Sequence, residues 1–445
     1  MTMLIAERRV PVVAECDVLV CGGGPAGVAA AVSAARHGAE VVLLERWPRV
    51  GGMMTCALVT IWHRSDREKI VINGLVEEST RRAVAHGWGT EYGSPQGRHE
   101  THNFDPEGMT LVWHRMLDDA GVGTLCYTVA GEPIVEDGRI RGVLVDSKRG
   151  RRAITAQIVI DCTGDGDMAA KSGVPFEVGR DSDGRVQGMT MMYRLCGIDE
   201  ERLASLGERE RKALGERMRA AIEAGELPPA KTQNPCGYRN RTIPNMAAVA
   251  GDPLDEEELT RLTWHGRENV FRFLDYWRQH IPGYGRAQIE QTGFSLGIRE
   301  SRRVMGRKML TAEMVLGAEK QPDAIGHGVW MIDVHDPLGS GYTTWLDRGD
   351  DSMVPRGESY HIPLGMCLNE SIPNLAVAGR CASSTHEGHS SVRVQTHCMV
   401  MGQGVGTCAA MALDSGMAMH EVPTEHLQER LRADGVYLED VPAAG

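Results

Sequence analysis

The sequence lacks any C-x-x-C pair, although it contains eleven cysteines. That spacing is typical of zinc ribbons, iron–sulfur sites and redox disulfides, so its absence argues against all three. The sequence also lacks an uninterrupted apolar run long enough to cross a bilayer. Residues 1–15 carry no apolar core of a signal peptide, because Arg8 and Arg9 follow a very short apolar start. These absences predict a protein of the reducing cytoplasm with no membrane partner.

Basic residues are too few for a nucleic-acid surface. Lys and Arg number 48 against 60 Asp and Glu, which gives a formal net charge of -12, whereas phosphate binding needs basic patches. No internal repeat is visible, and 445 residues allow two or three domains. A homo-oligomer is compatible with the sequence. The 53 glycines indicate many tight turns and close backbone approaches to ligands.

An apolar run of strand type over residues 17–21 is followed at once by glycines. Gly22, Gly24 and Gly27 fit G-x-G-x-x-G, and a small-residue helix pattern begins after them. In this motif the first glycine allows the tight turn, the second lets the backbone approach a pyrophosphate, and the third lets the helix pack closely on the strand. The helix N-terminus offers free N–H groups and a partial positive charge. The stretch therefore predicts a dinucleotide site.

A second strand pattern over residues 40–44 ends at Glu45, about twenty residues beyond the glycines, where a carboxylate binds the ribose hydroxyls of a dinucleotide. A glycine pair, Gly51-Gly52, follows shortly afterwards. This order of features resembles the FAD-binding half of the glutathione-reductase-like and fumarate-reductase-like flavoproteins. The resemblance implies FAD bound by Gly22, Gly24, Pro25, Ala26, Gly27, Glu45, Arg46, Gly51, Gly52 and Met53.

Short strand patterns separated by turn signals run from 124 to 160 and predict a β-meander. The last of them leads into T-G-D-G-D at residues 163–167. Taken alone, this motif is compatible with a surface turn that carries solvated aspartates. The full run I-D-C-T-G-D-G-D resembles the I-D-x-T-G-D-G-D of a family of FAD-dependent oxidoreductases. The resemblance implies that Gly164 and Asp165 contact FAD.

The C-terminal part contains a further apolar strand pattern over 374–378, which ends at Gly379 and Arg380. A glycine-rich run, Gly402-Gln403-Gly404, leads into a small-residue helix pattern over 407–413. Both segments are similar to the corresponding motifs of the same flavoprotein family. The resemblance implies that Gly379, Arg380, Gln403 and Gly404 bind FAD, and that the helix beginning at Gly402 points its N-terminus at the flavin.

The expected fold is α/β: a Rossmann-like FAD-binding domain with a parallel sheet and a β-meander, interrupted by an α+β cap domain. We expect the FAD domain to comprise 1–174 and 291–445, and the cap to comprise 175–290; residues 291–370 are compatible with either unit. The motif G-x-R-E-S-R-R at 297–303 fits a salt-bridged surface helix, but the family carries it too, so a role in the site stays open.

No second strand–G-x-G-x-x-G–acid unit is present, so no separate NAD(P)H domain is expected. The sequence therefore predicts an FAD-dependent dehydrogenase or oxidase that takes hydride from a small polar metabolite onto the flavin. The alternative is a flavin monooxygenase or halogenase of the aromatic-hydroxylase type. The chain lacks the W-x-W-x-I-P of halogenases and the G-D-x-x-H-x-x-P of hydroxylases.

Histidines are the candidates for moving the substrate proton, because their ordinary pKa lies near neutrality. His386, His389 and His397 cluster after the Gly-Arg strand end, with Arg393 among them. We expect His386 or His397 to act as the base and Arg393 to assist. A structural role fits each histidine equally well. No metal is expected, since the histidines do not form H-E-x-x-H. Trp62 and His63 are candidates to face the flavin ring.

Overall fold

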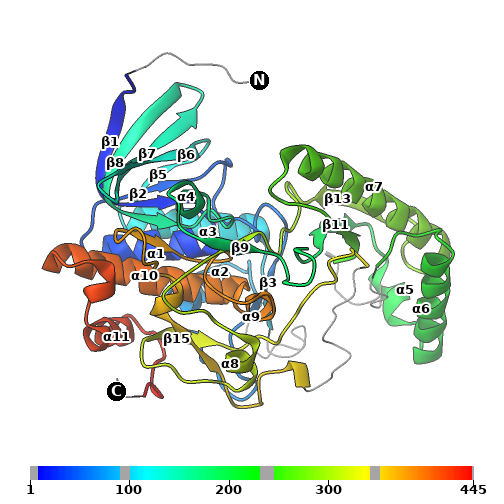
Figure 1. Cartoon of the computed structure of the whole chain (residues 1–445). Helices are drawn as coiled ribbons and strands as arrows, with labels where there is room; N and C mark the ends of the chain where they lie inside the picture. Colours follow the sequence, from blue (N-terminus) through cyan, green and yellow to red (C-terminus); the bar gives the residue numbers. More distant parts are fainter. Residues whose placement is uncertain (1–8, 91–100, 231–244, 341–350, 443–445) are drawn as a thin grey trace.

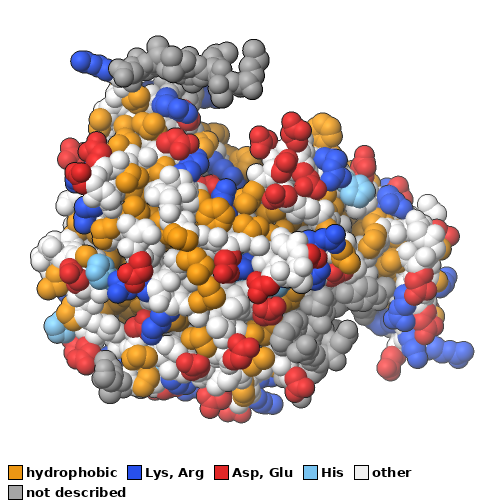
Figure 2. All heavy atoms as spheres, viewed as in Figure 1, with side chains coloured by type: hydrophobic (Ala, Val, Ile, Leu, Met, Phe, Trp, Pro, Cys, Tyr) orange, Lys and Arg blue, Asp and Glu red, His pale blue; other side chains and the backbone are white. Residues whose placement is uncertain are grey.

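The computed structural model describes residues 9–90, 101–230, 245–340 and 351–442. Over those ranges no helix combines the length and the apolar character that a membrane span requires. Figure 1 shows a sheet-and-helix body that holds both termini, and a second body at the right of the view that carries the longest helix. On the face drawn in Figure 2, acidic and basic side chains are interspersed.

The central sheet has seven strands in the order β5-β2-β1-β8-β7-β6, with β17 also paired to β8. Parallel pairing joins β5, β2, β1, β8 and β17, whereas β6, β7 and the first part of β8 form an antiparallel meander. The predicted parallel sheet with a β-meander is therefore confirmed. The strands are β1 (Val12–Cys21), β2 (Val41–Leu44), β5 (Gly123–Leu125), β6 (Val129–Glu136), β7 (Arg139–Ser147), β8 (Gly150–Asp161) and β17 (Leu375–Val377).

Two long helices, α1 (Pro25–Arg36) and α10 (Gln395–Ser415), lie side by side beneath the sheet (Figure 1). Their close approach depends on glycine, because a Cβ on Gly402 or Gly406 would overlap the backbone of α1. The prediction that this helix begins at Gly402 is wrong, since α10 begins at Gln395 with Val394 as its N-cap. The glycines of the run were expected at the start of a helix, but Gly402 and Gly406 lie within one, at its contact with α1.

The second body has a hydrophobic core of its own, in which Tyr193, Phe273, Trp277 and Tyr284 are buried. The α7 helix begins with Asp255 as N-cap, whose side chain accepts from the backbone N–H of Glu258, and buries one apolar face. We call this body the cap. Its elements are β10 (Met189–Met191), β11 (Tyr193–Cys196), α5 (Glu200–Ala204), α6 (Glu208–Glu223), β12 (Ala247–Val249), α7 (Glu256–His280) and β13 (Gln288–Thr292). The predicted limits of 175–290 stay a prediction.

Shorter elements complete the fold. Among them, β14 pairs with β9, so the R-E-S-R-R segment enters a strand and is not the surface helix that its charges suggested. The remaining elements are β3 (Ile61–His63), α2 (Leu75–Ala85), β4 (Thr101–Asn103), α3 (Pro106–Asp119), α4 (Asp167–Lys171), β9 (Phe176–Val178), β14 (Arg302–Val304), α8 (Ala312–Leu316), β15 (Ala324–Gly328), β16 (Tyr360–Pro363), η2 (Leu364–Met366), α9 (His386–Val392), η3 (Met419–Glu421) and α11 (Thr424–Ala433).

Candidate functional site

The glycine motif forms the turn between β1 and α1. Gly22 has φ +108°, a conformation that L side chains rarely adopt, and a Cβ on Gly27 would overlap the carbonyl oxygen of Gly22. Gly24 is the N-cap of α1, and no side chain in the described part of the molecule caps this helix. The first turn of α1 therefore presents N–H groups and the positive end of the helix dipole, which suits a phosphate group.

Glu45 lies directly beside this turn. Its side chain is buried, and its two oxygens accept hydrogen bonds from the backbone N–H groups of Gly23 (2.9 Å) and Trp47 (2.8 Å). Burial raises the pKa of Glu45, and these two hydrogen bonds oppose the shift. A carboxylate can accept about four hydrogen bonds, so acceptor positions remain for a ribose diol.

The second glycine pair closes over the first. Gly51 donates its N–H to the carbonyl of Gly23 at 2.7 Å, and a Cβ on Gly52 would lie 3.0 Å from the Cα of Gly24. Gly379 also reaches this place, because a Cβ there would lie 3.0 Å from the Cβ of Ala26. Segments far apart in the sequence thus converge on the α1 N-terminus. Arg46, beside Glu45, lies over the ring of Trp47, and Met53 follows Gly52 in the loop.

Asp165 of the T-G-D-G-D motif is buried and paired with Arg380, whose Nη2 lies 2.6 Å from the Asp165 Oδ1. The Ser301 hydroxyl donates to the same oxygen at 2.8 Å and accepts from Arg380 at 2.8 Å. Burial acts to raise the pKa of Asp165, but Arg380 and Ser301 hold it below its ordinary value. The alternative of a surface turn with a solvated aspartate is therefore wrong for Asp165.

Asp161 holds the T-G-D-G-D turn in shape. It is fully buried, and its carboxylate accepts from the N–H and hydroxyl of Thr163 and from the N–H of Ala169. Burial raises its pKa. Asp161 and Ser301 were not among the predicted site residues. The signal in the sequence that could have identified them was their place within the motifs I-D-C-T-G-D-G-D (Asp161) and R-E-S-R-R (Ser301).

Gln403 and Gly404 lie within α10 and make internal contacts. The Gln403 Oε1 accepts the N–H of Leu75 at 2.9 Å, at the start of α2, and a Cβ on Gly404 would lie 2.7 Å from Ile325. Gly74 also lies against the Gln403 side chain. The side-chain oxygen of Gln403 therefore caps a helix. The predicted position of these residues at a helix N-terminus is wrong.

Two of the three clustered histidines have both ring nitrogens engaged. The Nε2 of His397 accepts the N–H of Val329 at 3.1 Å, and its Nδ1 lies 3.1 Å from the carbonyl of Ser391. His389 contacts the Arg380 carbonyl through Nε2 (2.9 Å) and the Gln187 amide through Nδ1 (3.3 Å). Burial lowers the pKa of each to about 3. His397 has no nitrogen left for a substrate proton, which contradicts the base role predicted for it.

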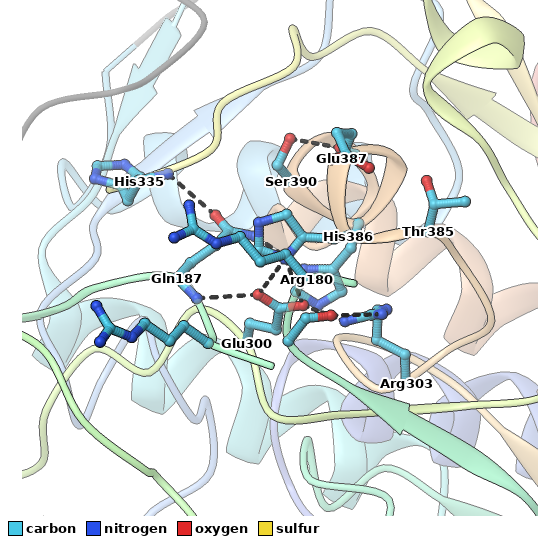
Figure 3. A network of polar contacts seen from close by, with 12 residues as sticks. Arg180, Gln187, Glu300, Arg303, His335, Thr385, His386, Glu387 and Ser390 are labelled. Atoms are coloured by element: carbon cyan, nitrogen blue, oxygen red, sulfur yellow. Dashed lines mark hydrogen bonds and ion pairs between the residues drawn. The ribbon is translucent and has the colours of Figure 1, made fainter. Parts of the chain in front are cut away.

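His386 differs from both. Its Nδ1 lies 2.9 Å from the Oε2 of Glu300, whereas its Nε2 is buried without a hydrogen-bond partner anywhere in the residues that the structure describes. Glu300 is itself fully buried and accepts from the N–H of Gln187 at 3.0 Å and from the guanidinium of Arg303. Figure 3 shows Gln187, Arg303 and His386 gathered around Glu300.

The charge on Glu300 is maintained by these partners. Burial acts to raise the pKa of this carboxyl, but the hydrogen bond with His386 and the nearby charges lower it to about 2. An ionised Glu300 accepts a hydrogen bond from the Nδ1–H of a neutral His386 ring, and in that tautomer the Nε2 carries the lone pair. Glu300 is a site residue beyond those predicted from the sequence. Its motif was noted, but nothing in it indicated a partner 86 positions away.

Arg393 lies next to this group, as the C-cap of α9 and directly before the N-cap of α10. Its Nη2 donates to the Asp333 carbonyl at 3.0 Å and lies 3.6 Å from the Asp333 carboxylate. The 21-residue α10 has Val394 as N-cap, and no described side chain caps it. Of the predicted ring-facing residues, Trp62 is in the core and donates its Nε1–H to Gln395 at 2.9 Å, whereas His63 stacks on Trp330 at 3.7 Å between ring centroids.

Metal ligands do not gather in the described ranges: no group of three or more His, Cys, Asp or Glu side chains there is arranged to hold an ion. The donor set at the α1 N-terminus fits a dinucleotide instead. It combines an uncapped helix end for a pyrophosphate, a carboxylate for a ribose, and glycines where a Cβ would obstruct the approach.

Comparison with known proteins agrees with this assignment. The model of a family described as "FAD dependent oxidoreductase" matches residues 17–431. The chain is 29% identical over 163 residues to a digeranylgeranylglycerophospholipid reductase of Methanosphaerula palustris, covering 34% of this chain and 39% of the reductase. It is 28% identical over 202 residues to the digeranylgeranylglycerophospholipid reductase 2 of Methanopyrus kandleri, covering 43% of this chain and 47% of that reductase.

These matches span less than half the length of the reductases. The chain is also 31% identical over 144 residues to the alpha subunit of sarcosine oxidase from Rhizobium meliloti, covering 30% of this chain and 14% of that protein. Among solved structures, a geranylgeranyl bacteriochlorophyll reductase-like protein of Thermoplasma acidophilum aligns with a TM-score of 0.47 at 13% identity, covering 94% of this chain and 84% of that one.

Proposed function

The chain belongs to the family of FAD-dependent oxidoreductases and is an enzyme whose cofactor is FAD, and from this premise we propose that it oxidises a small polar metabolite. Within the family we assign it to the proteins that carry T-G-D-G-D, with a cap over residues 175–290 and a place in the cytoplasm. FAD, when bound, would supply the redox chemistry of this oxidation, namely a hydride acceptor. We do not propose the lipid named for the reductases as the substrate of this chain, because the matches cover less than half of each reductase.

The chain's own residues would hold FAD through four groups. The α1 N-terminus at Gly24 would bind the pyrophosphate, and Glu45 would accept hydrogen bonds from the adenosine ribose. The buried Asp165–Arg380 pair would contact the bound FAD. The N-terminus of α10 and Arg393 would add positive potential, which favours the uptake of electrons by a nearby group.

The observation that carries the proposal is the Glu300–His386 pair. A histidine oriented through Nδ1 by a buried carboxylate, with its Nε2 unoccupied, is the arrangement of a general base. We assign to His386 the removal of a proton from a substrate hydroxyl or amine. Arg393 would be a positioning residue, because its guanidinium contacts Gln187 and Asp333.

The test is anaerobic reduction of the purified holoenzyme by a panel of alcohols, amines and carboxylic acids, monitored by loss of the flavin absorbance. We expect at least one small polar compound to bleach the flavin stoichiometrically, and NADPH at micromolar concentration to reduce it only slowly. Rapid stoichiometric bleaching by NADPH, with none by the panel, would contradict the proposal and favour the monooxygenase alternative.

A further inference from the structure

A small cleft lies between the cap strands β10 and β12 and the segment that follows β15 in the chain. It is shallow and open to solvent, and its interior of about 10 Å³ has room for about one water molecule. Its wall includes Thr190, Asn245, Arg299, His335 and Asp336. This room suits one polar end group of a ligand whose remainder lies outside the cleft, since pockets that enclose a whole small ligand measure about 300–1,000 Å³. The wall is polar and carries charge of both signs.

Arg299 is the cation of this wall, and its guanidinium is held by neutral acceptors. Its Nη1 donates to the Gly188 carbonyl (2.6 Å) and the Thr190 hydroxyl (2.9 Å), and its Nη2 donates to the Asn245 amide oxygen (3.0 Å). No carboxylate among the described residues forms an ion pair with Arg299. A guanidinium has five N–H donors, so these three bonds fix the fork and leave donors for a further acceptor.

The nearby guanidinium of Arg393 disfavours the charged form of Arg299. Burial and the nearby Arg393 lower the pKa of Arg299 to about 9, and only Asp333 opposes them. Asp333 is shared, because its carboxylate lies 3.6 Å from Arg393 and 3.5 Å from the Nε2 of His335. The Nε of Arg393 is buried and has no hydrogen-bond partner within the described ranges. An anion in the cleft would relieve the repulsion between the two arginines.

The other acid of the wall, Asp336, is turned to its own loop. Its carboxylate accepts from the backbone N–H of Leu338 at 3.0 Å and from the hydroxyl of Ser340. Asp336 therefore does not neutralise Arg299 by contact, although it keeps the cleft from being uniformly positive. This distribution suits a small ligand with a single anionic end better than a highly charged one.

We propose that the substrate of this enzyme carries a carboxylate, and that Arg299 binds it in this cleft. The inference rests on the proposed function for the identity of the ligand as the substrate. A carboxylate matches the planar guanidinium fork in geometry and can take two parallel hydrogen bonds from it. Arg299 and Glu300 are consecutive, so one segment holds both the proposed carboxylate anchor and the carboxylate that orients His386.

The experiment measures binding to the oxidised holoenzyme by isothermal titration calorimetry and does not require turnover. Acetate, pyruvate, L-lactate and L-alanine are each compared with the primary amide of the same skeleton at constant ionic strength, and methyl phosphate is the competing anion. Arg299→Gln removes the charge, and Arg299→Lys keeps the charge but loses the fork. Arg267→Gln is the matched control, because Arg267 also bonds neutral oxygens and lies outside the cleft wall.

We expect at least one carboxylate to bind ten-fold or more tightly than its amide. Arg299→Gln should abolish that preference, Arg299→Lys should weaken it, and Arg267→Gln should leave it unchanged. Equal affinity for every carboxylate and its amide in the wild type would overturn the inference even if no variant folds. So would tighter binding of methyl phosphate, or an unchanged preference in Arg299→Gln. Carboxylate binding without bleaching by any panel compound would count against the hydride reaction and leave the anion site intact.

Discussion

Glu45 is the residue on which adenosine binding depends most directly in this account. Replacing Glu45 with alanine removes a buried carboxylate, and hydrogen bonds to charged groups contribute about 1.5–3 kcal/mol each. We therefore expect the affinity for FAD to fall at least about ten-fold, as 1.4 kcal/mol corresponds to a factor of ten. Titration of FAD into the apoprotein measures it. Glu40→Ala, at an exposed position five residues earlier, is the control, and an equal loss in both variants would refute the ribose assignment.

At the scale of single residues, the sequence predicted those site residues that lie near one another along the chain. The turn at Gly22–Gly27 and the acid at Glu45 depend on one βαβ unit, so their spacing is sufficient to place them together. The Glu300–His386 pair could not be predicted, because its members are 86 positions apart and only the fold brings them together. His397 was misassigned for the same reason, since Val329 and Ser391 occupy its nitrogens.

At the scale of elements, the contact between α1 and α10 makes a sharp prediction. A methyl group on Gly402 would overlap the carbonyl of Ala26, so Gly402→Ala must push the two helices apart. Overpacking of this kind costs about 1–3 kcal/mol, and FAD affinity should fall with it because Ala26 lies in the first turn of α1. Chemical denaturation of the holoenzyme and FAD titration measure the two effects.

Gly215→Ala is the matched control for Gly402→Ala. Gly215 lies within α6, and a Cβ there meets nothing within 4 Å, so alanine should stabilise the helix by about 0.5–1 kcal/mol. A Gly402→Ala protein as stable as the wild type would show that α10 does not depend on this glycine contact. The sequence pattern alone gave the wrong helix start here, because a glycine run inside a closely packed helix has the same composition as one at a helix N-terminus.

At the scale of the whole molecule, buried histidines predict sensitivity to acid. Burial lowers the pKa of His63, His389 and His397 to about 3, below the ordinary value of 6.5. The unfolded chain therefore binds protons that the folded chain does not, and the stability present above pH 6.5 is lost as the pH falls towards 3. Each histidine contributes up to about 1.4 kcal/mol per pH unit in that window.

The free energy of unfolding, measured by urea denaturation between pH 7 and pH 5, tests this linkage. Its slope at pH 5 should correspond to the uptake of at least about three protons, and His389→Gln should reduce that uptake by about one. A flat profile over this range would contradict the neutral, buried state of these histidines. The sequence predicted the α/β architecture and the meander, but it could not show which of 16 histidines the fold would bury.

The central claim is that His386 takes the substrate proton while the flavin is reduced. The most direct test is stopped-flow reduction of the flavin under anaerobic conditions, with the most effective compound of the panel, in wild type and His386→Gln. Loss of a general base typically costs about 10²–10⁴-fold in rate. The account predicts a rate at least about a hundred-fold lower in the variant with FAD content unchanged. A variant that keeps its FAD and reduces it within about three-fold of the wild-type rate would contradict the account, because removing a general base costs far more than that.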